Sequence, residues 1–193
     1  HDLRQPVQAI VLSLTPARRK LEQGDQAGLA ELLDIVSHSA GILSRQMSSL
    51  RQLTKLEAGV FTPKIQPVAL AQAVRLSWSQ HEIRARKRGV RCEMVLDEAE
   101  SVFVPTDPTM FHQIVDNLIA NAIKYADRSK PVPPFVRLRA RVLDGQAWIS
   151  VQDNGVGIAA EHLDKGEIFK PYFQGHNELP EEEKGVGLGL SIV

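Results

Sequence analysis

Amide and amine side chains recur at helical spacing along residues 108–125, a segment that we expect to form one helix. Because side chains three or four positions apart share a face of a helix, these polar groups should lie in a single stripe. The stripe consists of Gln113, Asn117, Asn121 and Lys124. The apolar positions predict a separate buried face, made of Phe111, Ile114, Val115, Leu118 and Ala122. Taken alone, such a stripe is more typical of a solvated face than of a binding site.

Two glycine-rich segments give the stripe a chemical context. Residues 153–157 (DNGVG) come directly after an expected strand, and residues 185–189 (GVGLG) come directly before the apolar start of a helix. Glycine has no β-carbon to hold a backbone away from a ligand, and the amides at a helix N-terminus bind phosphate. Either segment alone would also suit a tight turn. Two such segments on either side of one polar insertion predict a nucleotide pocket.

The elements around this pocket are predicted to form an α+β sandwich. Apolar residues alternate with polar ones in two segments, which is the pattern of strands with one solvated face. The alternating apolar residues are Val90, Cys92, Met94, Leu96, Val136, Leu138, Ala140 and Val142. A third strand over residues 147–151 should follow the second through a turn at Asp144 and Gly145. Helices over 70–88 and 108–125 would then cover one face of a mixed or antiparallel sheet.

A helical hairpin is expected before this sandwich. Apolar residues follow one another in alternating steps of four and three from Leu29 to Leu50, which is the heptad period of a helix packed in a bundle. One long helix should therefore cover about residues 28–58, with a shorter apolar helix before a turn at residues 24–28. A second apolar row on the long helix exceeds what one hairpin partner covers. Two chains are therefore predicted to form a four-helix bundle, as a homodimer.

These patterns divide the chain into a hairpin over residues 1–59, a linker over 60–68 and a second domain over 69–193. Because the last residues stop as a helix begins, the second domain is expected to be C-terminally incomplete. The 23 basic and 23 acidic residues balance, which argues against nucleic acid or a membrane surface as a partner. No apolar run reaches the roughly 18 residues of a membrane span. The segment is expected to be cytoplasmic, with its single cysteine, Cys92, in the core.

Four segments in this order resemble the sequence boxes of histidine kinases, within the ATPase superfamily that includes a heat-shock chaperone, type II topoisomerases and a mismatch-repair protein. They are HQIVDNLIANAIKY at 112–125, DNGVGI at 153–158, IFKPYFQ at 168–174 and GVGLGLSIV at 185–193. The resemblance implies that the domain binds ATP and Mg²⁺, with Asn121 as the metal ligand and Asn117 beside it. It also implies that Lys124 contacts phosphate, that Tyr125 closes the base pocket and that Asp153 accepts a hydrogen bond from the adenine amino group.

The same resemblance implies a mobile lid over the nucleotide, made of residues 154–184. Phe169 and Phe173 are expected to pack this lid down. The glycines of the two nucleotide loops should let the backbone approach the ligand and hinge the lid. These glycines are Gly155, Gly157, Gly185, Gly187 and Gly189.

The opening of the hairpin, HDLRQP at residues 1–6, resembles the phosphoacceptor box of histidine kinases. A neutral imidazole carries a nucleophilic nitrogen near pH 7, so His1 is expected to attack the γ-phosphorus of ATP. Asp2 can orient the ring and take up its proton, and Pro6, which lacks an amide hydrogen, should bend the first helix. The resemblance further implies transfer of the phosphoryl group to an aspartate of a response-regulator receiver domain. Where many relatives carry Thr, Ser or Asn, this chain has Gln5, which is expected to orient water for dephosphorylation of that receiver.

Two other functions are compatible with the sequence. One is an ATP-driven conformational switch, as in the chaperone and topoisomerase branches, which would not require the acceptor box at His1. The other is a degenerate kinase that serves as a receiver-binding scaffold, although Asn121, Asp153 and the expected glycines are all present. The acceptor box is also similar to that of hybrid kinases, which implies a fused receiver. Anchoring of the whole protein to the inner membrane is a further expectation.

Overall fold

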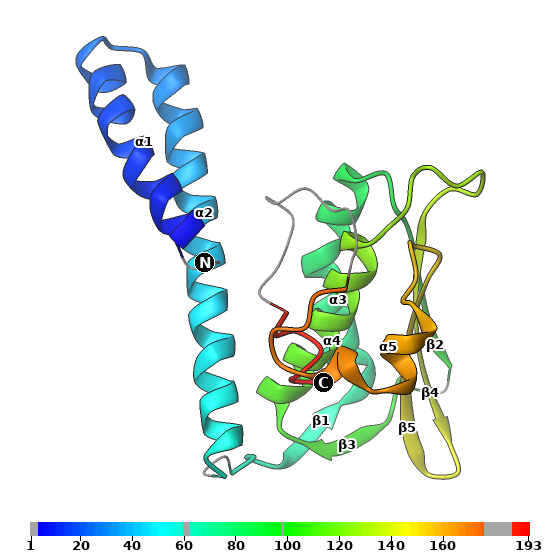
Figure 1. Cartoon of the computed structure of the whole chain (residues 1–193). Helices are drawn as coiled ribbons and strands as arrows, with labels where there is room; N and C mark the ends of the chain where they lie inside the picture. Colours follow the sequence, from blue (N-terminus) through cyan, green and yellow to red (C-terminus); the bar gives the residue numbers. More distant parts are fainter. Residues whose placement is uncertain (1–3, 60–61, 98, 176–186) are drawn as a thin grey trace. The chain divides into compact units, whose positions relative to one another are not determined.

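The computed structural model describes residues 4–59, 62–97, 99–175 and 187–193. The chain divides into two compact units, residues 1–61 and residues 62–193. The first unit holds α1 (Arg4–Glu22) and α2 (Gln26–Glu57), which run side by side as a hairpin (Figure 1). Among the described residues, none of the helices combines the length and the apolar character that a membrane crossing requires.

The turn of this hairpin is held by one carboxylate. Gly24 adopts a positive φ of 69°, which glycine allows without strain, and Asp25 follows it directly before α2. The side chain of Asp25 accepts the backbone N–H of Gly28 at 2.9 Å and the ammonium of Lys20 at 2.6 Å. The bond from Lys20 lowers the pKa of the Asp25 carboxyl, and the Gly28 amide lowers it further. The predicted hairpin is therefore present, with α2 starting at Gln26, slightly earlier than the sequence suggested.

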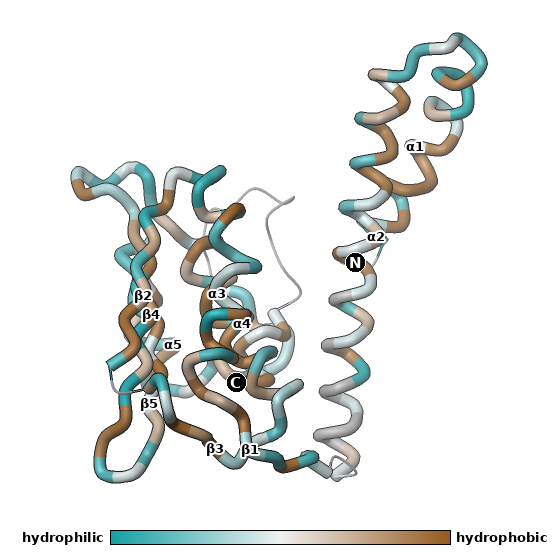
Figure 2. Tube along the Cα trace, turned by 180° about the vertical axis from the view of Figure 1, so that it is seen from behind, coloured by the Kyte–Doolittle hydropathy of each residue, from teal (hydrophilic) through white to brown (hydrophobic). Residues whose placement is uncertain are grey.

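Much of the apolar surface of the hairpin is exposed. Among its described residues, only Pro6, Ser13 and Ser39 are buried. Figure 2 shows hydrophobic residues along α1 and the facing part of α2. The large apolar side chains that remain exposed are Val7, Val11, Leu12, Leu14, Leu21, Leu33, Ile35, Met47 and Leu50. One hairpin thus leaves apolar surface that its two helices do not cover.

The second unit packs helices against one face of a mixed sheet (Figure 1). Its elements are β1 (Gln66–Ala69), α3 (Leu70–Lys87), β2 (Arg91–Asp97), β3 (Phe103–Thr106), α4 (Pro108–Lys124), β4 (Phe135–Leu143), β5 (Gln146–Asp153), α5 (Ala160–Asp164) and a 3₁₀ turn, η1 (Glu167–Phe169). The main sheet has the strand order β2-β4-β5, with β2 parallel to β4 and β4 antiparallel to β5. Asp144 and Gly145 join β4 to β5 with φ values of 52° and 74°, as the predicted turn requires. The predicted α+β architecture is confirmed.

Strand β4 shows the alternation that the sequence predicted. Val136, Leu138 and Ala140 are fully buried against the helices, whereas the arginines between them face the other way. On that solvated face, Arg137 forms a 2.9 Å ion pair with Glu93 of β2. On the apolar side of β2, Cys92 packs against the core, and burial raises the pKa of its thiol. Cys92 is therefore a core residue, as expected.

Strands β1 and β3 form a separate two-stranded sheet that the sequence analysis did not anticipate. They pair antiparallel, from Gln66 with Thr106 to Ala69 with Phe103. Strand β1 thus begins inside the expected linker over residues 60–68 and is bonded within the second unit. The polar residue that follows β3, Asp107, then caps α4.

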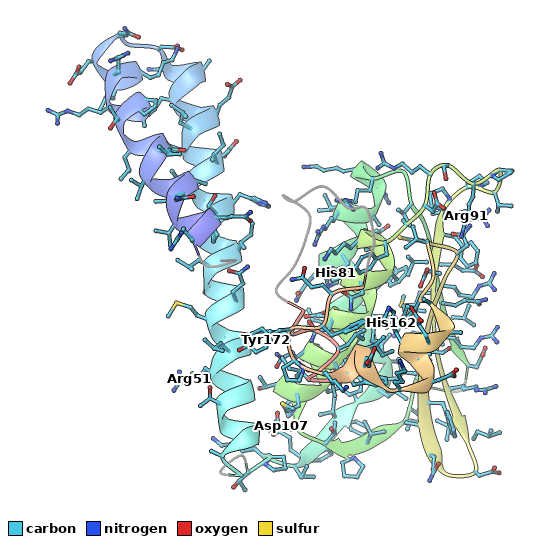
Figure 3. The ribbon with its side chains drawn as sticks, viewed as in Figure 1. Arg51, His81, Arg91, Asp107, His162 and Tyr172 are labelled. Carbon is cyan, nitrogen blue, oxygen red and sulfur yellow. The ribbon has the colours of Figure 1, made fainter. Side chains whose placement is uncertain are left out.

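The carboxylate of Asp107, which is labelled in Figure 3, accepts hydrogen bonds from three backbone N–H groups. Its Oδ1 accepts from Thr109 at 2.9 Å and from Met110 at 3.1 Å, and its Oδ2 accepts from Lys64 at 2.8 Å. These bonds, that from Lys64 first, lower the pKa of the Asp107 carboxyl. One carboxylate therefore satisfies the free amides at the start of α4 and ties the preceding segment to it.

The buried face of α4 is rotated from the one that the sequence predicted. Ile119 and Ile123 are almost completely buried, whereas Ile114 and Leu118, which were expected in the core, are half-buried. Helix α4 contacts α3 and strands β4 and β5, and these neighbours decide which of its apolar residues are covered. The complete set of buried residues on α4 is Phe111, Val115, Ile119, Ala122 and Ile123.

Candidate nucleotide site

The amide stripe of α4 meets the second glycine segment. The Nδ2 of Asn117 donates a hydrogen bond to the backbone oxygen of Gly189 at 3.1 Å. A β-carbon on Gly189 would lie 3.6 Å from the Oδ1 of Asn117 and 3.7 Å from the Nδ2 of Asn121. Residues more than 60 positions apart therefore come together here, with two amides against a backbone that carries no side chain. The sequence placed these groups in one pocket, and the structure brings Asn117, Asn121 and Gly189 into contact distance.

The first glycine segment follows β5 and presents a carboxylate. The Oδ1 of Asp153 accepts the N–H of Gly155 at 2.8 Å, which leaves its second oxygen for a ligand. The N–H of Val156 donates to the backbone oxygen of Tyr125 at 3.0 Å, so the loop is attached to the C-terminal end of α4. Gly157 adopts a φ of 80°, a conformation that favours glycine. Asp153 is thus held by its own loop and remains exposed to a ligand.

Gly155 is required by close packing. A β-carbon at this position would lie 2.2 Å from the backbone oxygen of Tyr125 and 2.9 Å from the Oδ1 of Asp153. Neither separation is compatible with a real β-carbon, and the first involves a backbone atom that cannot simply rotate away. The loop can therefore approach α4 only because residue 155 has no side chain.

Lys124 and Tyr125 contact each other at the end of α4. The Nζ of Lys124 lies 4.7 Å from the centroid of the Tyr125 ring, a cation–π arrangement. The resemblance implied that Lys124 contacts phosphate and that Tyr125 closes the base pocket. Both side chains are half-buried, and the backbone oxygen of Tyr125 is bonded to the loop after Asp153. The two roles stay predictions.

A backbone hydrogen bond joins the expected lid to the second glycine segment. Tyr172 (labelled in Figure 3) donates its N–H to the backbone oxygen of Gly187 at 3.0 Å. Gly187 has a φ of 73°, and a β-carbon there would lie 2.5 Å from the backbone oxygen of Phe173. Both the backbone conformation and the contact require glycine at position 187.

The two lid phenylalanines differ in exposure. The ring of Phe173 contacts the imidazole of His162, with centroids 5.0 Å apart at 65°. His162 also pairs with Glu167 at 2.9 Å, and this hydrogen bond lowers the pKa of the Glu167 carboxyl. Phe169 is 54% exposed at the end of the short η1 turn. Packing of the lid by these two rings stays a prediction.

Several predicted residues lie outside the described part of the chain. These are His1, Asp2, Gly185 and the lid residues 176–184. Gln5 and Pro6 lie in the first described turn of α1, where Gln5 is exposed and Pro6 is buried. The bend expected at Pro6 concerns the carbonyl four residues earlier, at Asp2, so it also falls outside the described residues.

The donor set at α4 suits a hard cation bound together with phosphate. Within the described ranges, no group of three or more His, Cys, Asp or Glu side chains is placed to hold a metal ion. Magnesium, however, is usually held by only one or two protein oxygens together with substrate phosphates and water. Asn121, whose Nδ2 is the atom nearest to the Gly189 position, also carries an amide oxygen that could serve as one such ligand.

Two residues of this region were missed from the sequence. The Oδ1 of Asn154 accepts the N–H of Phe135 at 2.8 Å, and its Nδ2 donates to the backbone oxygen of Pro133 at 3.1 Å. Lys130 donates from Nζ to the backbone oxygens of Asn154, at 2.9 Å, and of Gly155. Asn154 lies inside the glycine segment 153–157, and this position could have indicated its structural role. Lys130 stands in a polar loop with no pattern that indicates these contacts.

Part of the second unit matches a known family of ATPases. Residues 106–193 match the family described as histidine kinase-, DNA gyrase B- and HSP90-like ATPase. This match covers the amide stripe, both glycine segments and the Asp153 loop.

The whole chain is further similar to sensor histidine kinases. It is 31% identical over 196 residues to the swarming motility regulation sensor protein RssA of Serratia marcescens, with all of this chain and 38% of that protein covered. It is 30% identical over 193 residues to the histidine protein kinase DivJ of Caulobacter vibrioides, with all of this chain and 31% of that protein covered. The chain thus spans about a third of these curated relatives.

Solved structures agree with this assignment. The catalytic domain of the histidine kinase ThkA is 26% identical, with a TM-score of 0.55, over 67% of this chain and 78% of that one. The histidine kinase AdeS of Acinetobacter baumannii shares the fold over all of this chain and 83% of that one, with a TM-score of 0.66 and 22% identity. Residues 106–193 therefore match an ATPase domain of the histidine kinase-, DNA gyrase B- and HSP90-like family, and the whole chain is similar to sensor histidine kinases.

Proposed function

We propose that this chain is the catalytic core of a protein-histidine kinase that transfers the γ-phosphoryl group of ATP to His1. The proposal is carried by the junction of Asn117 and Asn121 with the Gly189 backbone, on the same helix to whose C-terminal end the loop after Asp153 is bonded. The acceptor box at residues 1–6 supplies the nucleophile that a nucleotide pocket alone would lack. Because ATP is the phosphoryl donor, we place this segment in the cytoplasm.

The nucleotide would be held by residues from three segments. The free oxygen of Asp153 accepts a hydrogen from the adenine amino group, since Gly155 already occupies the other oxygen. Tyr125, at the end of α4, borders the base. The ammonium of Lys124, which lies over the Tyr125 ring in this structure, would contact the phosphates. Asn121 and Asn117 lie against the backbone at Gly189, where the phosphates of the nucleotide would bind. Bound Mg²⁺ would neutralise developing charge on the phosphate oxygens, with Asn121 as its protein ligand.

The transfer requires little covalent chemistry from the protein. A neutral ring nitrogen of His1 forms a bond to the γ-phosphorus while the bond from phosphorus to the bridging oxygen breaks, which releases ADP. Asp2 orients the ring and takes up the proton that the imidazole loses. Most of the acceleration then comes from positioning and charge neutralisation.

We propose that the first unit assembles with a second copy of itself. The exposed apolar side chains of α1 and α2 support this proposal, because two hairpins that pack together would bury them in a four-helix bundle. The phosphoryl group would then pass from His1 to an aspartate of a receiver domain. The partners of this chain would therefore be a second copy of its hairpin and a receiver domain.

Labelling tests the transfer itself. The full-length protein should retain phosphate from ATP labelled in the γ position and none from ATP labelled in the α position, and His1→Gln should retain neither. An active wild-type ATPase that keeps no label would favour the conformational switch instead. Binding of a receiver without ATP turnover would favour the degenerate scaffold.

Gln5→Ala is expected to slow dephosphorylation of a phosphorylated receiver about tenfold, while labelling of the kinase continues at the wild-type rate. Gln5 is exposed one turn after His1, so its amide can orient the attacking water. The decay of labelled receiver, with and without kinase, measures the effect. Gln8→Ala, another exposed glutamine on α1, serves as the control. Equal decay with wild type and Gln5→Ala would contradict this role.

A further inference from the structure

Lys130 makes two bonds to the loop that carries Asp153. This lysine lies in the segment between α4 and β4, and its ammonium donates to the backbone oxygens of Asn154 and Gly155. Both oxygens belong to consecutive peptide groups directly after Asp153. An exposed lysine usually stays in solvent, so a side chain that bridges two neighbouring carbonyls is an ordered feature of this loop.

The same two peptide groups make the bonds that define the site. The peptide that offers the Asn154 oxygen to Lys130 offers the Gly155 N–H to the Oδ1 of Asp153 at 2.8 Å. The next peptide offers the Gly155 oxygen to Lys130 and the Val156 N–H to the backbone oxygen of Tyr125 at 3.0 Å. Since the C=O and N–H of a trans peptide point in opposite directions, one ammonium fixes the planes of both groups.

Charge adds to this geometric effect. A cation at a carbonyl oxygen polarises the peptide and makes its N–H a stronger donor. Lys130 should therefore strengthen the bond from Gly155 to Asp153 as well as orient it. The orientation of the carboxylate decides which of its oxygens faces the ligand.

We propose that Lys130 is a positioning residue that holds the Asp153 carboxylate ready for the amino group of adenine and so sets the affinity and base preference of the nucleotide site. The inference rests on the proposed role of Asp153. Lys130 touches no reacting atom, and its effect passes through the two peptide groups. Removal of Lys130 should weaken the binding of nucleotides that carry the amino group and leave the binding of nucleotides that lack it unchanged.

The test compares the affinity of the full-length protein for ADP and for inosine diphosphate, which has an oxygen in place of the amino group. Lys130→Met is expected to weaken ADP binding about fivefold, as suits partial loss of one charge-assisted contact, and to leave inosine diphosphate binding unchanged. Lys130→Arg should restore most of the ADP affinity, because a guanidinium can donate to both carbonyls. Lys87→Met, an exposed lysine at the end of α3, is the matched control.

Asp153→Asn separates this inference from the proposed site. If Asp153→Asn binds ADP as tightly as wild type, the proposed site itself is wrong. If Asp153→Asn weakens ADP binding but Lys130→Met does not, Lys130 has no positioning role. Equal weakening of ADP and inosine diphosphate by Lys130→Met would also overturn the inference, because a general support of the fold would not distinguish the two bases. A thermal melt of each variant shows that the domain is folded.

Discussion

Asn121→Ala is expected to lower the initial rate of phosphate transfer from ATP about a hundredfold or more. In the proposed site the amide oxygen of Asn121 would be the protein ligand of the metal ion, and alanine offers no such oxygen. Alanine is favourable within a helix, and Asn121 is only half-buried, so the fold of α4 should survive. The rate is measured with γ-labelled ATP over a range of magnesium concentrations.

Gln113→Ala is the matched control for this variant. Gln113 lies on the same stripe of α4, two turns before Asn121 and away from the Gly189 contact. The Gln113→Ala variant should transfer phosphate at nearly the wild-type rate. A wild-type rate for Asn121→Ala at every magnesium concentration would remove Asn121 from the metal site.

Gly155→Ala is expected to reduce nucleotide affinity about thirtyfold, which corresponds to the loss of two hydrogen bonds of about 1 kcal/mol each. The new β-carbon would lie 2.2 Å from the backbone oxygen of Tyr125, so the loop must move away from α4. That movement breaks the bond from Val156 to Tyr125 and releases Asp153 from the Gly155 amide. Isothermal titration with ADP measures the change in affinity.

The control for this variant is Gly175→Ala. A β-carbon on Gly175 meets no atom within 4 Å, and its backbone does not have a positive φ. This substitution should therefore leave the affinity for ADP unchanged. Equal affinities of Gly155→Ala and Gly175→Ala would show that the Asp153 loop does not form the nucleotide site.

Regular patterns predicted most of the fold correctly. The alternation in β4 and the heptad spacing in α2 arise from local geometry, so each strand or helix is visible in its own residues. The turn at Asp144 and Gly145 was predicted for the same reason, because its residue types match the positive φ values that it needs. Strand β3 was missed because its four residues include a proline and gain their order from pairing with β1.

The parts of the site that lie in sequence motifs could be predicted. The parts that depend on contacts between residues far apart in the sequence could not. The sequence indicated that Asn117 and the Gly189 segment share a pocket, and the structure joins them by a hydrogen bond. No pattern indicates that Lys130 reaches the loop after Asp153, since this contact depends on how two loops approach each other. The packing of Ile119 likewise depends on the neighbours of α4, which periodicity alone does not reveal.

We propose that phosphate from ATP comes to rest on the imidazole of His1. The most direct measurement is tandem mass spectrometry of the full-length protein after incubation with magnesium and ATP, kept alkaline throughout digestion. One phosphate is expected on the peptide that contains His1, and it should be lost after brief treatment with acid because a phosphoramidate is acid-labile. An acid-stable phosphate on serine or threonine, or ATP turnover with an unmodified His1, would contradict it.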